Sequence, residues 1–167
     1  MNSEKVDLIF GRNPVKEALK VKRTKRIYIT SNFSNKEILD LISENAVPKI
    51  IRNPKELDSL CSNGVHQGIA AEIKPYEYYS LEYILASAKK VTNPTVVILD
   101  GINDPHNMGA ILRSCDVFGV VGVIISKHHQ VSLSSTVAKT SAGAINYVPV
   151  CVVNNLNQTI DILKKNG

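Results

Sequence analysis

The residues best placed to do chemistry lie in one segment, Leu99–Cys115 (LDGINDPHNMGAILRSC). It begins at the end of a continuous apolar stretch, TVVIL, and open α/β sheets bind ligands at the carboxyl ends of such strands. We expect Asn107 to cap the helix that follows. Gly109 removes a side chain from the first turn of that helix, so free backbone N–H groups there can receive an anion such as a phosphate. The segment predicts an anion site at a helix start.

Arg113 is the cation of this segment. A guanidinium stays protonated, and its planar fork suits a phosphate or an oxygen on which negative charge develops. The alternative is that Arg113 pairs with Asp116, three residues further along the same helix, on a solvated face. The residues alone leave both interpretations open.

A second candidate surface is a run of positive charge near the start of the chain. The net charge of +5 is unevenly spread: residues 1–75 carry 13 basic and 9 acidic side chains, against 7 and 6 in residues 76–167. Five cations fall within seven residues, and they are Lys20, Lys22, Arg23, Lys25 and Arg26. Such a run is either a solvated helix end or a surface that faces phosphates.

Strand and helix signals alternate along the chain and predict the elements that position these residues. Apolar patterns predict strands at 7–10, 26–30, 49–52, 68–73, 95–100, 120–126 and 147–152. Helix starts are predicted at Asn13-Pro14, at a capping box of Ser34 and Glu37, at Asn53-Pro54 and at Ser80. Further helices are predicted at 107–118, 134–142 and 156–165. The pattern indicates a small α/β sandwich followed by βα units with a buried parallel sheet.

The segment KPYEYYS at 74–80 interrupts this alternation with a proline and three tyrosines. We interpret it as the connector between two domains. Its tyrosines could stack on nucleic-acid bases, but packing against the protein's own core is favoured.

Composition excludes several classes of protein. The chain has 167 residues, 44% hydrophobic and 21% charged, which is typical of a globular protein and leaves no apolar run long enough to cross a membrane. Its start shows no signal peptide, so we expect a cytoplasmic protein without membrane contact. Its three cysteines lie far apart and are expected to be buried, His128 and His129 are a poor metal pair, and no metal site is predicted. Neither a P-loop nor a Rossmann glycine fingerprint is present, which disfavours a small-molecule nucleotide enzyme.

The segment around Arg113 resembles motif 1 of the SpoU (TrmH-type) RNA 2′-O-ribose methyltransferases, D-x-x-x-D-P-x-N-x-G-A-I-x-R-[ST]-[AC]. The residues that match it are Asp104, Pro105, Asn107, Gly109, Ala110, Ile111, Arg113, Ser114 and Cys115. The likeness extends to FGRNPVKEAL at 10–19, His66-Gln67-Gly68 and KTSAGAINYVPV at 139–150. Within the family, the chain is most similar to the bacterial enzymes that methylate a guanosine of 23S rRNA.

The resemblance implies an L30e-like RNA substrate-binding domain at 1–73, a connector and helix at 74–90, and the amino-terminal part of a SPOUT methyltransferase domain at 91–167. It implies that Arg113 and Asn107 are catalytic, with the arginine acting on the ribose hydroxyl and the asparagine positioning the ribose. RNA, specifically 23S rRNA, would be bound by Arg12, Asn13 and the cationic run at 20–26.

The family also implies S-adenosylmethionine as cofactor and a homodimer in the full-length protein. Most of its cofactor pocket is formed by a carboxyl-terminal knot that we expect beyond Gly167, so the cofactor-binding residues are unknown here. We expect the 167-residue chain alone to be inactive. The alternatives are a non-catalytic RNA-binding fragment of such an enzyme, or a tRNA 2′-O-methyltransferase.

Overall fold

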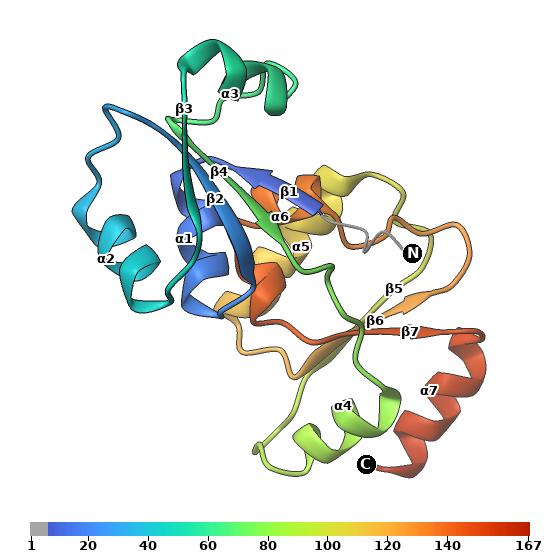
Figure 1. Ribbon diagram of the computed structural model, residues 1–167. Coiled ribbons are helices and arrows are strands. Elements are labelled where there is room, and N and C mark those ends of the chain that lie inside the picture. The colour runs from blue at the N-terminus through green and yellow to red at the C-terminus, as the bar shows by residue number, and fades with distance from the viewer. Residues whose placement is uncertain (1–6) are drawn as a thin grey trace, which may run out of the picture.

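The structure is a computed structural model that describes residues 7–167, and its frame is a pair of β-sheets, one from each half of the chain (Figure 1). The first sheet has the order β1-β4-β2-β3, in which β4 runs antiparallel to β1 and β2, while β2 and β3 are parallel. Its strands are β1 (Asp7–Phe10), β2 (Thr24–Thr30), β3 (Lys49–Arg52) and β4 (Ile69–Ile73).

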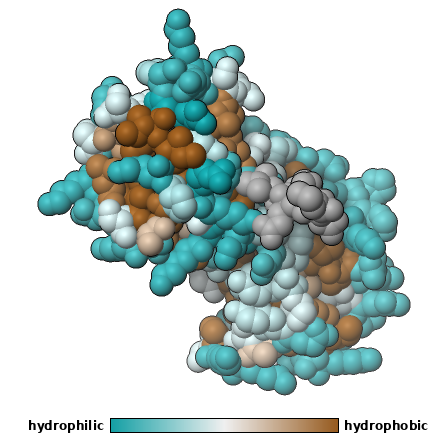
Figure 2. Space-filling view, viewed as in Figure 1, coloured by the Kyte–Doolittle hydropathy of each residue, from teal (hydrophilic) through white to brown (hydrophobic). Residues whose placement is uncertain are grey.

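Helices cover both faces of this first sheet because its strands carry apolar side chains on both sides. One face packs against α1 (Arg12–Lys20) and α2 (Lys36–Glu44), and the other against α3 (Pro54–Leu60). The mixed α/β unit expected from the sequence is therefore confirmed. Figure 2 shows apolar side chains exposed together on this unit, surrounded by hydrophilic ones.

The second sheet is parallel, as predicted, with the order β5-β6-β7. Its strands are β5 (Val96–Leu99), β6 (Gly122–Ser126) and β7 (Val150–Val153). One face is covered by α4 (Leu81–Ala88) and α7 (Leu156–Lys165). The other is covered by α5 (Pro105–Val117), α6 (Ser135–Thr140) and the short 3-10 helix η1 (Ala144–Asn146). The expectation that residues 95–100 are buried on both faces holds only in part, because β5 is at the sheet edge and three of its four residues are half-buried.

Three helix starts differ from the sequence predictions. Asp104, not Asn107, caps α5, and its Oδ1 accepts a hydrogen bond from the His106 backbone N–H at 2.9 Å. Asn35, not Ser34, caps α2 through the Ile38 N–H. Helix α1 begins at Arg12 after Gly11, so Asn13 lies inside it. At α2 and α5 a second possible cap lies within three residues of the observed one, whereas the Gly11 cap of α1 makes no side-chain hydrogen bond.

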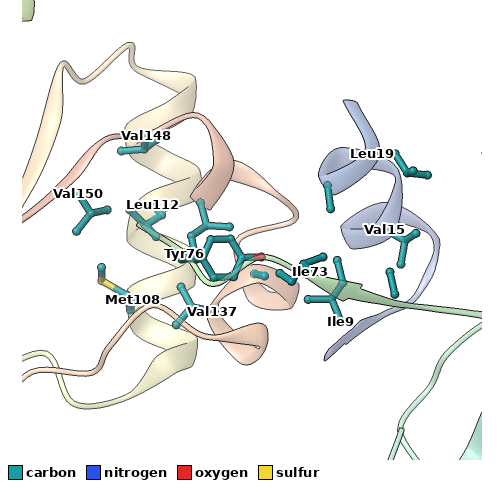
Figure 3. Close-up of a cluster of buried hydrophobic side chains, with 14 of the residues drawn as sticks. Ile9, Val15, Leu19, Ile73, Tyr76, Met108, Leu112, Val137, Val148 and Val150 are labelled. Carbon is teal, nitrogen blue, oxygen red and sulfur yellow. The ribbon is translucent and has the colours of Figure 1, made fainter. Parts of the chain in front are cut away.

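A single apolar core joins the two units. The connector carries Tyr76, which is 8% exposed, into the space between the two sheets. Figure 3 shows its ring with Met108 and Leu112 of α5 on one side and Ile9 and Ile73 of the first sheet on the other. The prediction that a connector tyrosine packs on the protein is confirmed for Tyr76.

The rest of the connector extends the second sheet. The Tyr79 N–H donates to the Val150 carbonyl at 2.8 Å, and Tyr79 forms a parallel bridge with Cys151. Tyr78 remains 41% exposed while its hydroxyl accepts from the Leu133 N–H at 2.9 Å. Residues 74–80 therefore pack on both units instead of forming a free linker.

A hydrogen bond at the surface also links the two units. The Tyr147 hydroxyl, just after η1, donates to Glu17 Oε2 of α1 at 2.6 Å. Gly143 adopts a φ of +97° beside it, and a Cβ there would lie 2.5 Å from Glu17 Cγ. The two units approach closely because this position has no side chain. No helix among residues 7–167 is long and apolar enough to cross a membrane.

Candidate functional site

The loop before α5 is held at the carboxyl edge of the second sheet by side-chain and backbone hydrogen bonds. The Ile102 N–H donates to Gln130 Oε1 at 3.0 Å, and the Val131 N–H donates to the Ile102 carbonyl at 2.9 Å. Gln130 comes from the loop that follows β6, so the loops after two neighbouring strands are tied together. This is the edge where open α/β sheets bind ligands.

Asn107 and Arg113 both lie on the exposed side of α5. They are six residues apart, which at 3.6 residues per turn separates them by about 120° around the helix. Ala110 lies midway between them and is also exposed. The two side chains therefore flank a strip with only a methyl group at its centre.

Arg113 makes no ion pair with Asp116 in the part of the chain that the structure describes, although both are exposed on α5. The alternative interpretation from the sequence, a solvated pair three residues apart, is not what the structure forms. The guanidinium is free to meet a ligand anion.

Gly109 serves a different purpose from the one expected. It faces α6, and a Cβ at this position would lie 2.0 Å from Thr140 Oγ1 and 2.8 Å from the Ser141 backbone nitrogen. Thr140 Oγ1 in turn donates to the Pro105 carbonyl at 3.1 Å. Gly109 therefore allows α5 and α6 to pack closely, and it opens no space for an anion.

Arg12 and Asn13 are exposed at the start of α1. The Arg12 backbone N–H donates to Gln67 Oε1 at 2.9 Å, and its guanidinium carbon lies 5.9 Å from the centroid of the Phe33 ring. The structure thus brings Gln67 of the His66-Gln67-Gly68 segment to the FGRNP segment. It leaves the Arg12 and Asn13 side chains at the surface.

The cationic run lies at the other end of α1 and in β2, about 13 Å away along a nine-residue helix. Several of its charges already have partners. Lys20 pairs with Glu17 at 3.0 Å and Arg26 with Glu72 at 3.4 Å. The structure therefore separates the predicted RNA-binding residues into two groups.

Arg23, another member of the run, contacts the connector. Its Nη2 donates to the Pro75 carbonyl at 2.8 Å, its Nε to the Lys74 carbonyl at 3.4 Å, and its guanidinium carbon lies 4.6 Å from the centroid of the Tyr76 ring. Arg23 therefore holds the connector in place, a role that no local sequence pattern indicated.

Two further residues had no role assigned from the sequence: Gln130, and Lys139, which begins the KTSAGAINYVPV segment at 139–150. The Lys139 ammonium lies 4.8 Å from the centroid of the Phe10 ring in the other unit. The Gln130 Nε2 is buried and has no hydrogen-bond partner in residues 7–167. The contacts of both residues could not be predicted from the sequence, because each meets its neighbours only through the tertiary fold.

The cysteines and possible metal ligands add no further chemistry. Cys61, Cys115 and Cys151 are buried and free, as expected. Burial raises the pKa of the Cys115 thiol, which keeps it protonated and a poor nucleophile. Within the described residues, no group of three or more His, Cys, Asp or Glu side chains could hold a metal ion.

Comparison with protein families gives two matches, separated by residues 80–93. Residues 8–79 match the RNA 2′-O ribose methyltransferase substrate-binding family, and residues 94–167 match the SpoU rRNA methylase family. Together the two matches include motif 1, the connector as far as Tyr79 and the cationic run.

Relatives with similar sequences are named as TrmH family tRNA/rRNA methyltransferases. A protein of Staphylococcus haemolyticus named as a TrmH family tRNA/rRNA methyltransferase is 47% identical over 165 residues, which is 96% of this chain and 66% of that protein. A protein of the same name from Staphylococcus aureus is 44% identical, with the same coverage. The chain thus spans 66% of the length of these relatives.

Solved structures share the fold. The SpoU methyltransferase AviRb from Streptomyces viridochromogenes, in complex with AdoMet, superimposes with a TM-score of 0.73 at 20% identity, covering 95% of this chain and 58% of that one. An RNA methyltransferase of the TrmH family from Porphyromonas gingivalis gives a TM-score of 0.71 at 23% identity, covering 98% and 61%.

Proposed function

Because residues 8–79 match the RNA 2′-O ribose methyltransferase substrate-binding family and residues 94–167 match the SpoU rRNA methylase family, we propose that this chain forms the RNA-binding and catalytic-arginine part of an enzyme that methylates a ribose 2′-hydroxyl of RNA. A guanosine of 23S rRNA is the substrate that the motif resemblance favours, and the relatives' names leave tRNA as the second candidate. The observation that carries the proposal is the exposed strip of α5, where Arg113 lies free of any ion pair in residues 7–167 and Asn107 flanks it.

Arg113 would stabilise negative charge at the reacting oxygen. A ribose 2′-hydroxyl is a poor nucleophile until its proton leaves, and a permanently protonated guanidinium does not act as the base. It instead donates hydrogen bonds to the oxygen as charge develops there, or clamps the neighbouring phosphate with its fork. A contact of this kind contributes about 3–4 kcal/mol to transition-state stabilisation.

Asn107 would orient the ribose. Its amide offers both a donor and an acceptor, which suits the neighbouring hydroxyls of a sugar. Because it approaches from the opposite side of the Ala110 strip, it fixes the sugar without competing with Arg113 for the same oxygen. We propose that Asn107 and Arg113 lie on the same two sides of Ala110 in the full-length protein.

S-adenosylmethionine is the family's cofactor, and the residues present fit one side of its site. The Gln130 Nε2, a buried donor without a partner, lies in the loop tied to the start of the motif-1 segment at the carboxyl edge of the second sheet. Gln130 and the loop at 101–104 would contact the cofactor there. When bound, it supplies an electrophilic methyl group on a sulfonium. We propose that the remaining walls come from the knot region of the full-length family members.

The unit of residues 7–73 would deliver the RNA. Its match to the substrate-binding family and its excess of positive charge support an L30e-like RNA-binding role. The connector and α4 at 74–90 link it to the methyltransferase unit at 91–167. A full-length homodimer remains part of the proposal.

The test is methylation by the full-length gene product. Purified protein is incubated with methyl-labelled S-adenosylmethionine and either 23S rRNA or tRNA transcripts, and the product is hydrolysed with alkali. A 2′-O-methyl group protects the adjacent phosphodiester, because cleavage needs the free hydroxyl, so label in an alkali-resistant dinucleotide is expected. Label on a base, or label in protein, would contradict the proposal.

A further inference from the structure

A cleft of about 420 Å³ lies between the two units, on the side of α6. One wall comes from the first unit and includes Ile9, Phe10 and Pro14, and the other comes from the second unit and includes His106, Thr136 and Lys139. Neither wall alone makes the cleft, which exists because β1 and α1 are docked against α6. Its apolar walls with a few polar groups are typical of a site for a planar organic ligand.

Within residues 7–167, the charge of this cleft is positive and uncompensated. Lys139 is exposed and forms no ion pair within residues 7–167, and the residues that line the cleft include no carboxylate. The neighbouring Glu17 is already paired with Tyr147 and Lys20. The Phe10 ring holds the ammonium in place at 4.8 Å without using its hydrogen-bond donors. Lys139 is therefore positioned to receive an anion.

The cleft is aligned with the candidate catalytic strip. His106 lines the cleft, and Arg113 follows it by seven residues on the same helix. Seven residues are close to two full turns, so both side chains lie on one side of α5, about 10 Å apart along its axis. A short stretch of single-stranded nucleic acid spans such a distance.

We propose that this cleft binds a nucleotide adjacent to the one that is methylated, an inference that rests on the proposed function. The Lys139 ammonium holds the phosphate of this nucleotide. Its base packs in the cleft against Phe10 and Pro14, with the Thr136 hydroxyl within reach of its polar edge. Single-stranded RNA is recognised in this way, through bases that leave the stack and pack on aromatic side chains.

The experiment measures RNA binding by the full-length protein and does not depend on methylation. The probe is a short RNA hairpin whose loop carries 4-thiouridine. Lys139→Met keeps the apolar stem and removes the charge, while Lys139→Arg keeps the charge. Lys164→Met, on α7, is the matched control because Lys164 is an exposed lysine remote from the cleft. Thermal melting confirms that each variant is folded.

The plot of log affinity against log salt has a negative slope. We expect Lys139→Met to make this slope shallower by about 0.7, the value of one lost single-strand phosphate contact. Lys139→Arg should retain the wild-type slope, and Lys164→Met should leave it unchanged. Cross-links from 4-thiouridine should map to peptides that contain Phe10 or Lys139.

Equal slopes for Lys139→Met and Lys164→Met, or cross-links confined to other peptides, would overturn the inference. Binding of a protein partner in place of RNA at the cleft would do the same. If the wild-type enzyme methylates RNA and Lys139→Met binds RNA like wild type, the proposal of a nucleotide site in the cleft is refuted and the proposed function stands. If the full-length protein binds RNA at the cleft but methylates no ribose, the proposed function is refuted and the proposal of a nucleotide site in the cleft stands.

Discussion

At the scale of single residues, the structure distinguishes side chains that are free to act from those committed to the fold. Arg113 and Asn107 are exposed on α5, and Arg113 has no ion pair in the described chain. Arg23 is committed, because its guanidinium binds two connector carbonyls and covers Tyr76. Arg113 and Arg23 carry the same guanidinium group, and only their surroundings distinguish a side chain that is exposed and unpaired from one that holds the fold.

Replacing Arg113 by lysine in the full-length enzyme should lower the rate of methyl transfer by about 10²–10³-fold, because the charge remains but the planar fork is lost. The free energy of unfolding should stay close to wild type, since the side chain is exposed. Single-turnover methylation and urea unfolding measure the two quantities. Asp116→Asn, at another exposed position of α5 outside the motif-1 match, is the control. A wild-type rate in Arg113→Lys would show that the arginine has no catalytic role.

The members of the cationic run should respond differently to substitution. Lys22→Glu should weaken RNA binding. It should also make the negative slope of log affinity against log salt shallower by about 0.7–0.9 for each phosphate contact that is lost. Arg23→Ala should instead reduce the free energy of unfolding by about 1–3 kcal/mol, because it leaves connector carbonyls without their charged donor. Filter binding at several salt concentrations and urea unfolding separate the two effects. An unchanged slope for Lys22→Glu would mean that this part of the run is only solvated.

At the scale of elements, close packing between helices fixes the site. The α5–α6 contact depends on Gly109, and the α1–η1 contact depends on Gly143 and on the Tyr147–Glu17 hydrogen bond. Burial opposes ionisation of Glu17, but the bond from Tyr147 and the charge of Lys20 outweigh it and lower the pKa of that carboxyl. The α5–α6 contact and the α1–η1 contact together determine where α5 lies relative to the first sheet.

Gly109→Ala should destabilise the protein by about 1–3 kcal/mol, the usual cost of overpacking. Helix propensity alone predicts the opposite, a gain of about 1 kcal/mol for alanine over glycine inside a helix. The new methyl group would overlap Thr140 and the Ser141 backbone, and backbone cannot move aside cheaply. Chemical denaturation gives the sign. A stabilised variant would show that α5 and α6 do not pack this closely.

Tyr147→Phe should remove one hydrogen bond between the units and lower the free energy of unfolding by about 1 kcal/mol. Burial and then the bond to Glu17 raise the pKa of Tyr147 from 10 to about 12. A raised pKa stabilises the fold below the unfolded value and loses that contribution as pH rises through the folded one. The difference between wild type and variant should therefore be constant between about pH 5 and pH 10, shrink between pH 10 and about 12, and also shrink at acid pH, where Glu17 becomes protonated. Urea unfolding across this range tests it, and a difference that does not change with pH would contradict it.

At the scale of the whole molecule, one apolar surface is left uncovered. An apolar groove of about 470 Å³ runs between α5 and β5, an edge strand that pairs only with β6 in the described chain. Phe118 beside it is 81% exposed and Val117 is 77% exposed. Edge strands with apolar neighbours tend to associate with other protein surfaces.

The 167-residue chain alone should self-associate and bind S-adenosylmethionine weakly or not at all. Sedimentation at several protein concentrations should show a mass above that of the monomer, and Phe118→Ser should shift the equilibrium towards the monomer. Titration calorimetry measures cofactor binding. A strict monomer with micromolar affinity for the cofactor would show that these residues complete the pocket by themselves.

The sequence by itself determined the α/β class, the position of most strands and helices, the motif around Arg113 and the burial of the cysteines. These features depend on periodicity, turn residues and short spacings, which are local properties of a chain. It also predicted correctly that Asn53 and Ser80 cap helices. Where two caps were available, as at Asp104 and Asn107, the local pattern did not decide between them.

Only the tertiary structure decided how the two units meet. Tyr76 joins the cores, Arg23 holds the connector, Gly109 admits Thr140, and Lys139 faces Phe10 across the cleft. Each of these contacts links segments that lie far apart in the sequence. Such contacts depend on how the whole chain packs, so no local sequence pattern predicts them. The residues that can do chemistry are visible in the sequence, and the cleft that would present RNA to them exists only in the fold.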